Sequence, residues 1–263
     1  MKRKLSAAAF SIVLMVFGFA ASAGAVDGTI EINQAKVLAA GGFPYTISVS
    51  GSYRLTGNLT VPVSTNAINV SAANVTIDLN GFLITGPGST STIPIGINSA
   101  GQSGVTVENG AISGFGLGVQ VGLFGIVRNM HTDKNGNGIF GGLNSVIEGC
   151  TANNSTQSGG SGISCDGVCV ISGNTVNGNP NLGIFCVANG CVISGNTANA
   201  NGTTGINCSG SGCLISGNTV FKNIIGISAD DTTTGYGGNV LKNTTNVSGG
   251  TSIGNNLCSG TVC

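Results

Sequence analysis

The sequence predicts an all-β solenoid of stacked parallel strands, and three observations lead to this fold class. The pentapeptide ISGNT occurs at 171–175, 193–197 and 215–219, at an interval of 22 residues. The chain of 263 residues contains 46 glycines and no tryptophan, yet 41% of its residues are hydrophobic. Short β-branched runs alternate with Gly, Asn and Ser turns, without helical periodicity inside the repeat, which is typical of one solenoid coil.

Two registers of apolar residues advance together along the chain. The first consists of the residues that open each ISGN-like segment: Ile77, Val107, Val127, Ile147, Ile171, Ile193, Ile215 and Val240. The second consists of apolar residues that follow a glycine: Ile97, Val119, Ile139, Ile163, Ile184, Ile206 and Ile227. Together they predict about eight coils of roughly 20 to 24 residues, whose strands pair with the coils above and below at about 4.8 Å.

The N-terminus has the pattern of a secretion signal, residues 1–25. Basic residues 2–4 precede an apolar run, and Ala23-Gly24-Ala25 forms a small-residue cleavage site. We expect the mature chain to be secreted or extracellular, with the periplasm as the alternative and with no membrane association after cleavage. It carries six Lys or Arg against nine Asp or Glu, and no basic cluster, which argues against a nucleic-acid partner.

Residues 26–66 are predicted to form an N-terminal cap, followed by the solenoid domain over 67–263. Within the cap, NQAKVLAA (Asn33 to Ala40) has the signals of a short helix, with Asn33 as N-cap and Gly41 as stop. Such a helix would cover the strand edges of the first coil, because bare edges promote aggregation.

Asparagines recur three residues after the opening position of many repeats and are predicted to stack at one turn. Asparagine tolerates a left-handed backbone, and its amide can bond to the next amide in the stack. The predicted column consists of Asn80, Asn174, Asn196, Asn218 and Asn243.

Eight of the nine cysteines form four local pairs around turns, and we predict disulfides between them. The pairs are Cys165 and Cys169, Cys186 and Cys191, Cys208 and Cys213, and Cys258 and Cys263. The coils on either side lose both cysteines together, which favours pairing within a coil, although bridges between stacked coils at about 4.8 Å remain open. Export favours disulfides over metal ligation, since no histidine or closed zinc spacing accompanies these cysteines. Cys150 is left over and is predicted to be a buried free thiol.

The repeats resemble those of the secreted bacterial right-handed parallel β-helix repeat proteins in the pectate-lyase-like superfamily. The similar segments include DGTIEINQAKVLAAGGFPYTISVSGSYRLTGNLTVP, NVTIDLNGF and GYGGNVLKNTTNVSGGTSIGNNLC, and the resemblance extends from about Asp27 to Cys263. It implies a right-handed parallel β-helix. The superfamily includes polysaccharide lyases, hydrolases, epimerases, tailspikes and adhesins, so the fold does not decide the function. Of the polygalacturonase-like motifs only an Asp-Asp pair is present, as Asp230 and Asp231.

One set of charged residues is a candidate catalytic site. Asp78, Glu108, Arg128 and Glu148 follow the opening residue in four consecutive coils, and side-chain alternation places them outside on one face. His131 and Asp133 follow Arg128 on adjacent outward positions. Carboxylates can serve as acid and base or bind calcium, and an arginine can bind a uronate. The alternative is an alternating surface charge ladder of little energetic value.

Few ionisable groups and an exterior rich in Ser, Thr and Asn favour a non-catalytic extracellular protein with a structural, surface-binding or carbohydrate-binding role. Its partner would be a polysaccharide or a cell-surface glycan. The alternative is a polysaccharide lyase, hydrolase or epimerase that acts on uronate-containing glycans through the charged residues. No cofactor is expected except calcium, for which Asp230 and Asp231 are candidate ligands. The alternative is that they are ordinary turn residues, since aspartate is common in turns that bind no metal. Metal or copper handling lacks the His and Met ligands expected for it.

Overall fold

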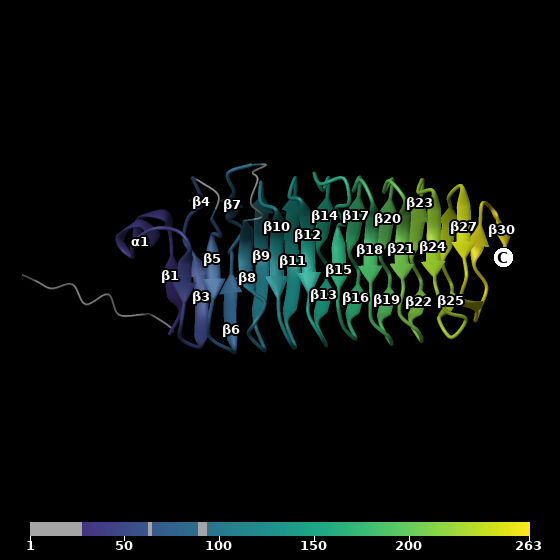
Figure 1. Ribbon diagram of the computed structural model, residues 1–263, viewed down its shortest axis with the longest axis horizontal. Coiled ribbons are helices and arrows are strands. Elements are labelled where there is room, and N and C mark those ends of the chain that lie inside the picture. The colour runs from purple at the N-terminus through teal and green to yellow at the C-terminus, as the bar shows by residue number, and fades with distance from the viewer. Residues whose placement is uncertain (1–27, 63–64, 89–93) are drawn as a thin grey trace, which may run out of the picture.

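The chain winds into a parallel β-solenoid of ten coils (Figure 1). The structure is a computed structural model that describes residues 28–62, 65–88 and 94–263, so the predicted signal peptide lies outside the described residues. Three columns of strands run along the solenoid, and each strand pairs with the equivalent strand of the next coil. Among the described residues, no helix has the length and apolar character needed to cross a membrane.

Column I is a ten-stranded sheet on one side of the solenoid. Its strands are β2 (Tyr45–Ile47), β5 (Ile68–Val70), β8 (Ile95–Ser99), β10 (Leu117–Val121), β12 (Asn137–Gly141), β15 (Ile163–Cys165), β18 (Leu182–Cys186), β21 (Thr204–Cys208), β24 (Ile225–Ala229) and β27 (Thr245–Ser248).

Column II contains the strands that hold the ISGN-like segments. They are β1 (Ile30–Ile32), β3 (Gly51–Leu55), β6 (Val75–Asp78), β13 (Val146–Glu148), β16 (Val170–Ser172), β19 (Val192–Ser194), β22 (Leu214–Ser216), β25 (Gly235–Gly237) and β28 (Thr251–Ser252).

Column III follows column II after one turn in each coil. Its strands are β4 (Leu59–Thr60), β7 (Leu83–Thr85), β14 (Thr151–Asn153), β17 (Thr175–Asn177), β20 (Thr197–Asn199), β23 (Thr219–Phe221), β26 (Val240–Lys242) and β29 (Leu257–Cys258). The long strands β9 (Thr106–Ser113) and β11 (Ile126–Asp133) run through columns II and III. The last strand, β30 (Thr261–Val262), pairs antiparallel with β29.

The interior is filled by the two apolar registers. Ile147, Ile171, Ile193 and Ile215 pair in register down column II and are completely buried. The glycine-led register, from Ile97 to Ile227, is likewise buried behind column I. Buried inward residues therefore alternate with outward residues along the strands, although some outward positions are apolar, among them Val170 and Leu214.

The register differs from the prediction after Ile215. Ile215 pairs with Tyr236, whereas Val240 pairs with Thr219 in column III. The segment YGGNV at 236–240 is therefore the degenerate copy of ISGNT, in which aromatic Tyr236 replaces isoleucine and Gly237 replaces serine. The segment VLKN at 240–243 resembles ISGN in sequence but begins in column III.

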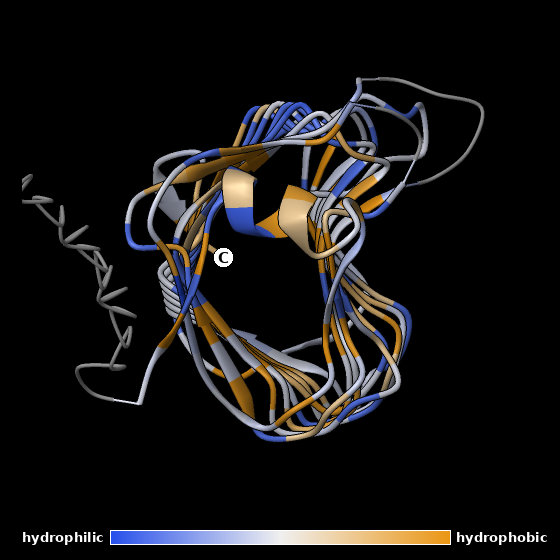
Figure 2. Cartoon of the chain, turned by 90° about the vertical axis from the view of Figure 1, so that its left-hand side faces the viewer, coloured by the Kyte–Doolittle hydropathy of each residue, from blue (hydrophilic) through white to orange (hydrophobic). Residues whose placement is uncertain are grey.

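The N-terminal end is covered by α1 (Gln34–Ala39), at the predicted place. Asn33 Oδ1 accepts a hydrogen bond of 3.0 Å from the Lys36 backbone N–H, which makes Asn33 the N-cap. Val37 is buried, and the helix lies across the end of the coils in Figure 2. Strand β3, within the stretch predicted as the cap, pairs with both β1 and β6 and so belongs to the stacked coils. These early strands account for ten coils where the repeats predict eight.

The asparagines form two ladders, which are buried except at Asn243 and Asn246, where the second ladder is partly buried. The first contains Asn174, Asn196, Asn218, Asn239 and Asn256, and the second contains Asn179, Asn201, Asn223, Asn243 and Asn246. Asn239 thus takes the position predicted for Asn243, which belongs to the second ladder because of the register change. Asn80 is exposed and lies outside both ladders, with its amide donating to Leu55 O at 3.3 Å.

Candidate functional site

The four predicted charged residues lie side by side on column II. The strand register aligns Asp78 with Glu108, Glu108 with Arg128, and Arg128 with Glu148. The register also adds Arg54, which is aligned with Asp78 one coil earlier. Sequence reasoning missed Arg54 because its coil has no recognisable ISGN-like segment. We call Arg54, Asp78, Glu108, Arg128 and Glu148 the charged row.

The charged row is largely neutralised by its own ion pairs. Arg54 Nε lies 3.4 Å from Asp78 Oδ2, and Arg128 Nε donates a hydrogen bond to Glu108 Oε2. This bond to Glu108 is the main reason that the pKa of Arg128 is raised. The Arg128 side chain is 45% exposed and that of Glu108 13%, so solvent screens the pair. Among the described residues, Glu148 forms no ion pair.

His131 and Asp133 do not join the charged row. They lie on the column III half of β11, where His131 aligns with Ala111 and Thr151, and Asp133 with Asn153. Asp133 Oδ1 accepts a hydrogen bond of 2.8 Å from Asn154 Nδ2. Within the described part of the chain, no hydrogen bond or ion pair links either residue to the row. The six candidate residues therefore form two groups on different columns.

Residues with a left-handed backbone form a second row beside the charged row. Each of them directly follows a residue of the charged row, or its equivalent in a later coil. Its first members are Asn109 and Asn129, with φ of 59° and 51°. Asn129 Nδ2 donates to Asn109 Oδ1 at 3.3 Å, and Asn109 Nδ2 donates to Asp78 Oδ1 at 3.2 Å. In the next five coils the same position is glycine, with φ of 61° to 67°: Gly149, Gly173, Gly195, Gly217 and Gly238.

The loss of side chains after Asn129 opens a shallow groove along the coils. The groove has a volume of about 520 Å³ and is lined by Asn129, Glu148, Gly149, Ser172, Gly173, Ser194 and Gly195. We call it the serine groove. Ser172 and Ser194 continue the charged row in register, because Glu148 aligns with Ser172 and Ser172 with Ser194. The groove thus begins at a carboxylate and continues along hydroxyl groups. Both serines belong to the ISGNT repeats, but the groove depends on the stacked glycines and is not apparent from the sequence.

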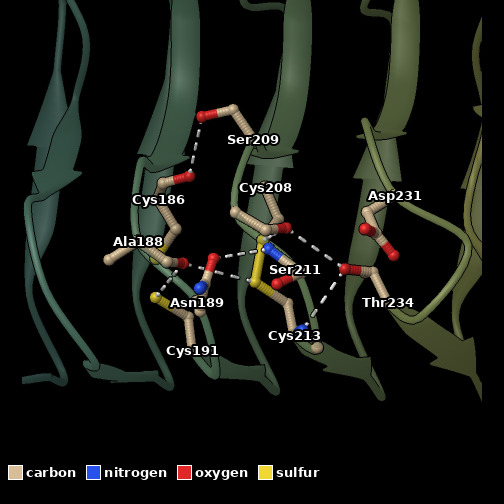
Figure 3. Close-up of a disulfide and its surroundings, with 12 residues drawn as sticks. Cys186, Ala188, Asn189, Cys191, Cys208, Ser209, Ser211, Cys213, Asp231 and Thr234 are labelled. Carbon is tan, nitrogen blue, oxygen red and sulfur yellow. Dashed lines mark hydrogen bonds between the residues drawn. A yellow bond between two sulfur atoms is a disulfide. The ribbon is translucent and has the colours of Figure 1, made fainter.

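Three of the four expected disulfides are present. They join Cys165 to Cys169, Cys208 to Cys213 and Cys258 to Cys263. Cys186 and Cys191, in the coil between the first two, are free and buried. Figure 3 shows this pair beside the Cys208–Cys213 disulfide, with Thr234 at the cysteine position of the following coil. The structure thus differs from the prediction at one pair.

The two free thiols lie close together, and the Cys191 thiol donates to Gly167 O at 3.2 Å. The interaction with Cys186 lowers the pKa of Cys191 to about 7, and the same interaction together with burial raises the pKa of Cys186. The sulfur atoms of Cys165, Cys186 and Cys191 lie within 4.8 Å of one another. Because Cys165 is bonded to Cys169, only two thiols remain, whereas a structural zinc site uses four ligands.

Cys150 occupies one end of the first asparagine ladder. Its backbone N–H donates to Asn174 Oδ1 at 2.8 Å, and its sulfur lies close to the carbonyl oxygens of Val127 and Glu148. Burial raises the pKa of Cys150 to about 12. The residue is therefore a protonated, packed thiol and not a nucleophile.

Asp230 and Asp231 lie in the turn after β24. The Asp231 carboxylate accepts hydrogen bonds from Thr233, which lower its pKa. Asp230 is exposed, and its backbone N–H donates to Cys208 O at 3.2 Å. Among the described residues, neither aspartate belongs to a group of three or more potential metal ligands. The Asp231 side chain therefore supports its own turn.

Comparison with known proteins shows likeness in structure only. No family model and no curated protein matches the sequence. The fold is similar to the Dettilon tailspike protein gp208, with a TM-score of 0.51 and 16% identity over 84% of this chain and 57% of that one. It is also similar to the enzymatically active domain of tailspike protein 2 of bacteriophage CBA120, with a TM-score of 0.52 and 16% identity over 81% of this chain and 38% of that one.

This chain therefore spans 57% and 38% of the length of these two solved structures. Identities of this size establish the fold alone. The register, the stacked coils and both similarities agree on it: the chain has the parallel β-helix fold.

Proposed function

We propose that the protein is a secreted, non-catalytic glycan-binding β-helix and that the serine groove is its binding surface. The observation that carries this proposal is the change from Asn109 and Asn129 to glycine at Gly149, Gly173 and Gly195. This change removes the side chain beside the charged row in three successive coils and leaves a groove that runs along the solenoid. A linear polymer fits such a surface better than a compact ligand does.

The chemistry of the groove suits sugar hydroxyls. Ser172 and Ser194 can each donate and accept a hydrogen bond, and the Glu148 carboxylate can accept from two hydroxyl groups. The two serines repeat at the coil spacing of about 4.8 Å, so they can contact successive parts of one chain. The exposed glycine backbone allows the ligand to approach closely.

A binding role is favoured over catalysis by the composition of the groove. Paired carboxylates normally flank the bond that a glycosidase breaks, and Glu148 is the only carboxylate among the residues that line the groove. Arg128 is bonded to Glu108, so its guanidinium is partly occupied before any uronate arrives. The groove is also shallow and open to water, which weakens electrostatic stabilisation of a transition state.

Catalysis on this fold is a real alternative, since one of the similar tailspike structures is described as an enzymatically active domain. An enzyme acting on uronate glycans here would need Arg128 to leave Glu108 and bind substrate. This alternative predicts turnover that depends on Arg128, whereas the binding proposal predicts none.

The proposal is tested by filling the groove without changing its backbone. A Cβ at Gly173 or Gly195 would meet no atom closer than 3.9 Å, and asparagine already occupies this left-handed position in two earlier coils. The double variant Gly173→Asn/Gly195→Asn should therefore fold while its side chains occupy the groove. Gly217→Asn is the matched control, because it has the same φ of 65° and the same free space but does not line the groove.

Binding is measured by affinity electrophoresis and calorimetry against polygalacturonate, alginate and a neutral β-glucan. We expect the double variant to lose about tenfold or more in affinity for a neutral glycan that the parent protein binds, while the control keeps it. Equal binding by all three proteins would overturn the assignment of the groove.

A further inference from the structure

A second groove lies after column III near the C-terminal coils and contains two lysines. Lys222 follows β23, and Lys242 ends β26 one coil later. The Lys222 backbone N–H donates to Lys242 O at 2.9 Å, so the two residues are adjacent along the solenoid. Both residues are exposed. The groove has a volume of about 860 Å³, and we call it the lysine groove.

The backbone directs Lys222 away from the interior. Its φ is 56°, and the same turn position is left-handed in four earlier coils, at Lys134, Asn154, Gly178 and Ala200. An asparagine of the second ladder comes next, and Asn201 and Asn223 are buried beneath the groove. The ladder therefore fixes the turn, while the lysine side chain is free to meet a ligand.

The lysine groove is positively charged and without a counter-charge. No Asp or Glu is among the residues that line it. Within the described residues, the ion pairs are Arg54 with Asp78 and Arg128 with Glu108, so neither Lys222 nor Lys242 has a carboxylate partner. The described residues include only six Lys and Arg, and two of them lie here. Two unpaired ammonium groups in one groove attract an anion.

The groove also has an apolar part. Phe221 takes the outward position that asparagine holds in the three preceding coils, at Asn153, Asn177 and Asn199. Phe221 is half-buried and aligned with Lys242. Ile224, which also lines the groove, is 55% exposed. An aromatic face beside ammonium groups suits a ring with an apolar face and a charged edge.

We propose that the lysine groove is a second binding site, which takes an acidic glycan: a sugar chain whose rings carry carboxylate or sulfate groups. Lys222 and Lys242 would contact two anionic groups of the chain, and Phe221 would stack on the ring between them. Each contact is a charge-assisted hydrogen bond in an exposed site, so binding weakens as the salt concentration rises. The site is separate from the serine groove and does not depend on it.

The test titrates the full mature protein with three hexasaccharides: oligogalacturonate, a sulfated glycosaminoglycan fragment and neutral cellohexaose. The variant Lys222→Gln/Lys242→Gln removes both charges and keeps the side-chain stems. Lys134→Gln is the matched control, because Lys134 has the same left-handed turn position in another coil. Thermal unfolding of each variant checks the fold.

We expect at least one anionic hexasaccharide to bind about tenfold or more tightly than cellohexaose at about 20 mM salt, and the preference to shrink at about 300 mM. Tighter binding of oligogalacturonate would identify carboxylate as the preferred anionic group, and tighter binding of the glycosaminoglycan fragment would identify sulfate. The double lysine variant should lose this preference, and Phe221→Leu should weaken it, while Lys134→Gln should leave it unchanged.

Two results would overturn the proposal. One is an equal loss in Lys134→Gln, which would indicate a general charge effect. The other is a preference that survives in the double lysine variant. The serine groove is distinguished by Gly173→Asn/Gly195→Asn, which should keep the anionic preference; loss of that preference there, with both lysines intact, would assign the anion to the serine groove.

Discussion

Asn196 is joined twice to Asn218 in the next coil. The backbone N–H and the side-chain Nδ2 of Asn196 both donate to Asn218 Oδ1, at 2.9 Å and 3.0 Å. A second hydrogen of the Asn196 amide bonds to Ile171 O at 2.9 Å, and Asn196 Oδ1 accepts from Asn174 in turn. Every polar atom of this buried side chain is therefore bonded, which explains why asparagine repeats at this turn.

Replacing Asn196 by alanine should lower the free energy of unfolding by roughly 3 kcal/mol, because it leaves buried donors of Asn174 and the carbonyl of Ile171 without partners. Urea unfolding measures the change. Asn80→Gly is the control, since Asn80 is exposed, lies outside both ladders and has a left-handed φ of 50° that glycine adopts without strain, and it should change stability by less than about 1 kcal/mol. Equal effects at the two sites would remove the ladder from the explanation of stability.

The number of free thiols tests the cysteine arrangement. The structure leaves Cys150, Cys186 and Cys191 free, so denatured but unreduced protein should react with three equivalents of a thiol reagent. Peptide mapping after alkylation should place the label on these three residues. A single reactive thiol, on Cys150, would mean that Cys186 and Cys191 are oxidised in the same way as the pairs in the adjacent coils.

Stability should depend on pH through the free thiols. The pKa of Cys191 is about 7 in the folded protein, below the ordinary value of 9.0, so its thiolate stabilises the fold at high pH and this stabilisation is lost as the pH falls through 7. Above pH 9 the unfolded chain ionises Cys150 and Cys186, whose pKa values are raised in the fold, so stability falls again.

We therefore expect a maximum in unfolding free energy near pH 9, with a slope below it of up to about 1.4 kcal/mol per pH unit. Thermal unfolding in a pH series measures this. Cys191→Ser should abolish the rise between pH 7 and 9, and an unchanged rise in that variant would contradict the thiolate assignment.

Two glutamates of the charged row allow a matched test of the serine groove. Glu148 lines the groove and has no ion pair among the described residues, whereas Glu108 is bonded to Arg128 and does not line it. Glu148→Gln should weaken glycan binding by about tenfold, equivalent to about 1.4 kcal/mol, and Glu108→Gln should leave binding nearly unchanged. The reverse order, measured by calorimetry, would place the ligand on the charged row and not in the groove.

The repeats alone predict most of the fold. A strict interval between identical turns fixes the coil length, and apolar residues at a constant offset identify the buried file, as Ile171, Ile193 and Ile215 demonstrate. The prediction fails where the repeat degenerates. Tyr236 does not resemble Ile215 in size or shape, so VLKN is a better match by sequence than the true copy, YGGNV.

Neither groove can be recognised from the sequence of a single coil, because each is lined by residues of several stacked coils. Gly173 appears in the sequence as an ordinary turn residue, and only stacking reveals that glycines of successive coils align beside serines. Lys222 and Lys242 are 20 residues apart and come together only in the true register, which the VLKN alignment misplaces. In this fold, the column and coil of two residues therefore indicate better than their separation in the sequence whether they lie together.

The most direct test of the proposed function follows binding and turnover in one experiment. The protein is incubated with polygalacturonate, alginate and a neutral β-glucan, with and without calcium, while retained polysaccharide, new reducing ends and unsaturated products are measured together. A non-catalytic glycan-binding protein retains a polysaccharide and yields no product over hours at micromolar concentration. Product formation that disappears in Arg128→Ala would contradict this account and make the charged row a catalytic site.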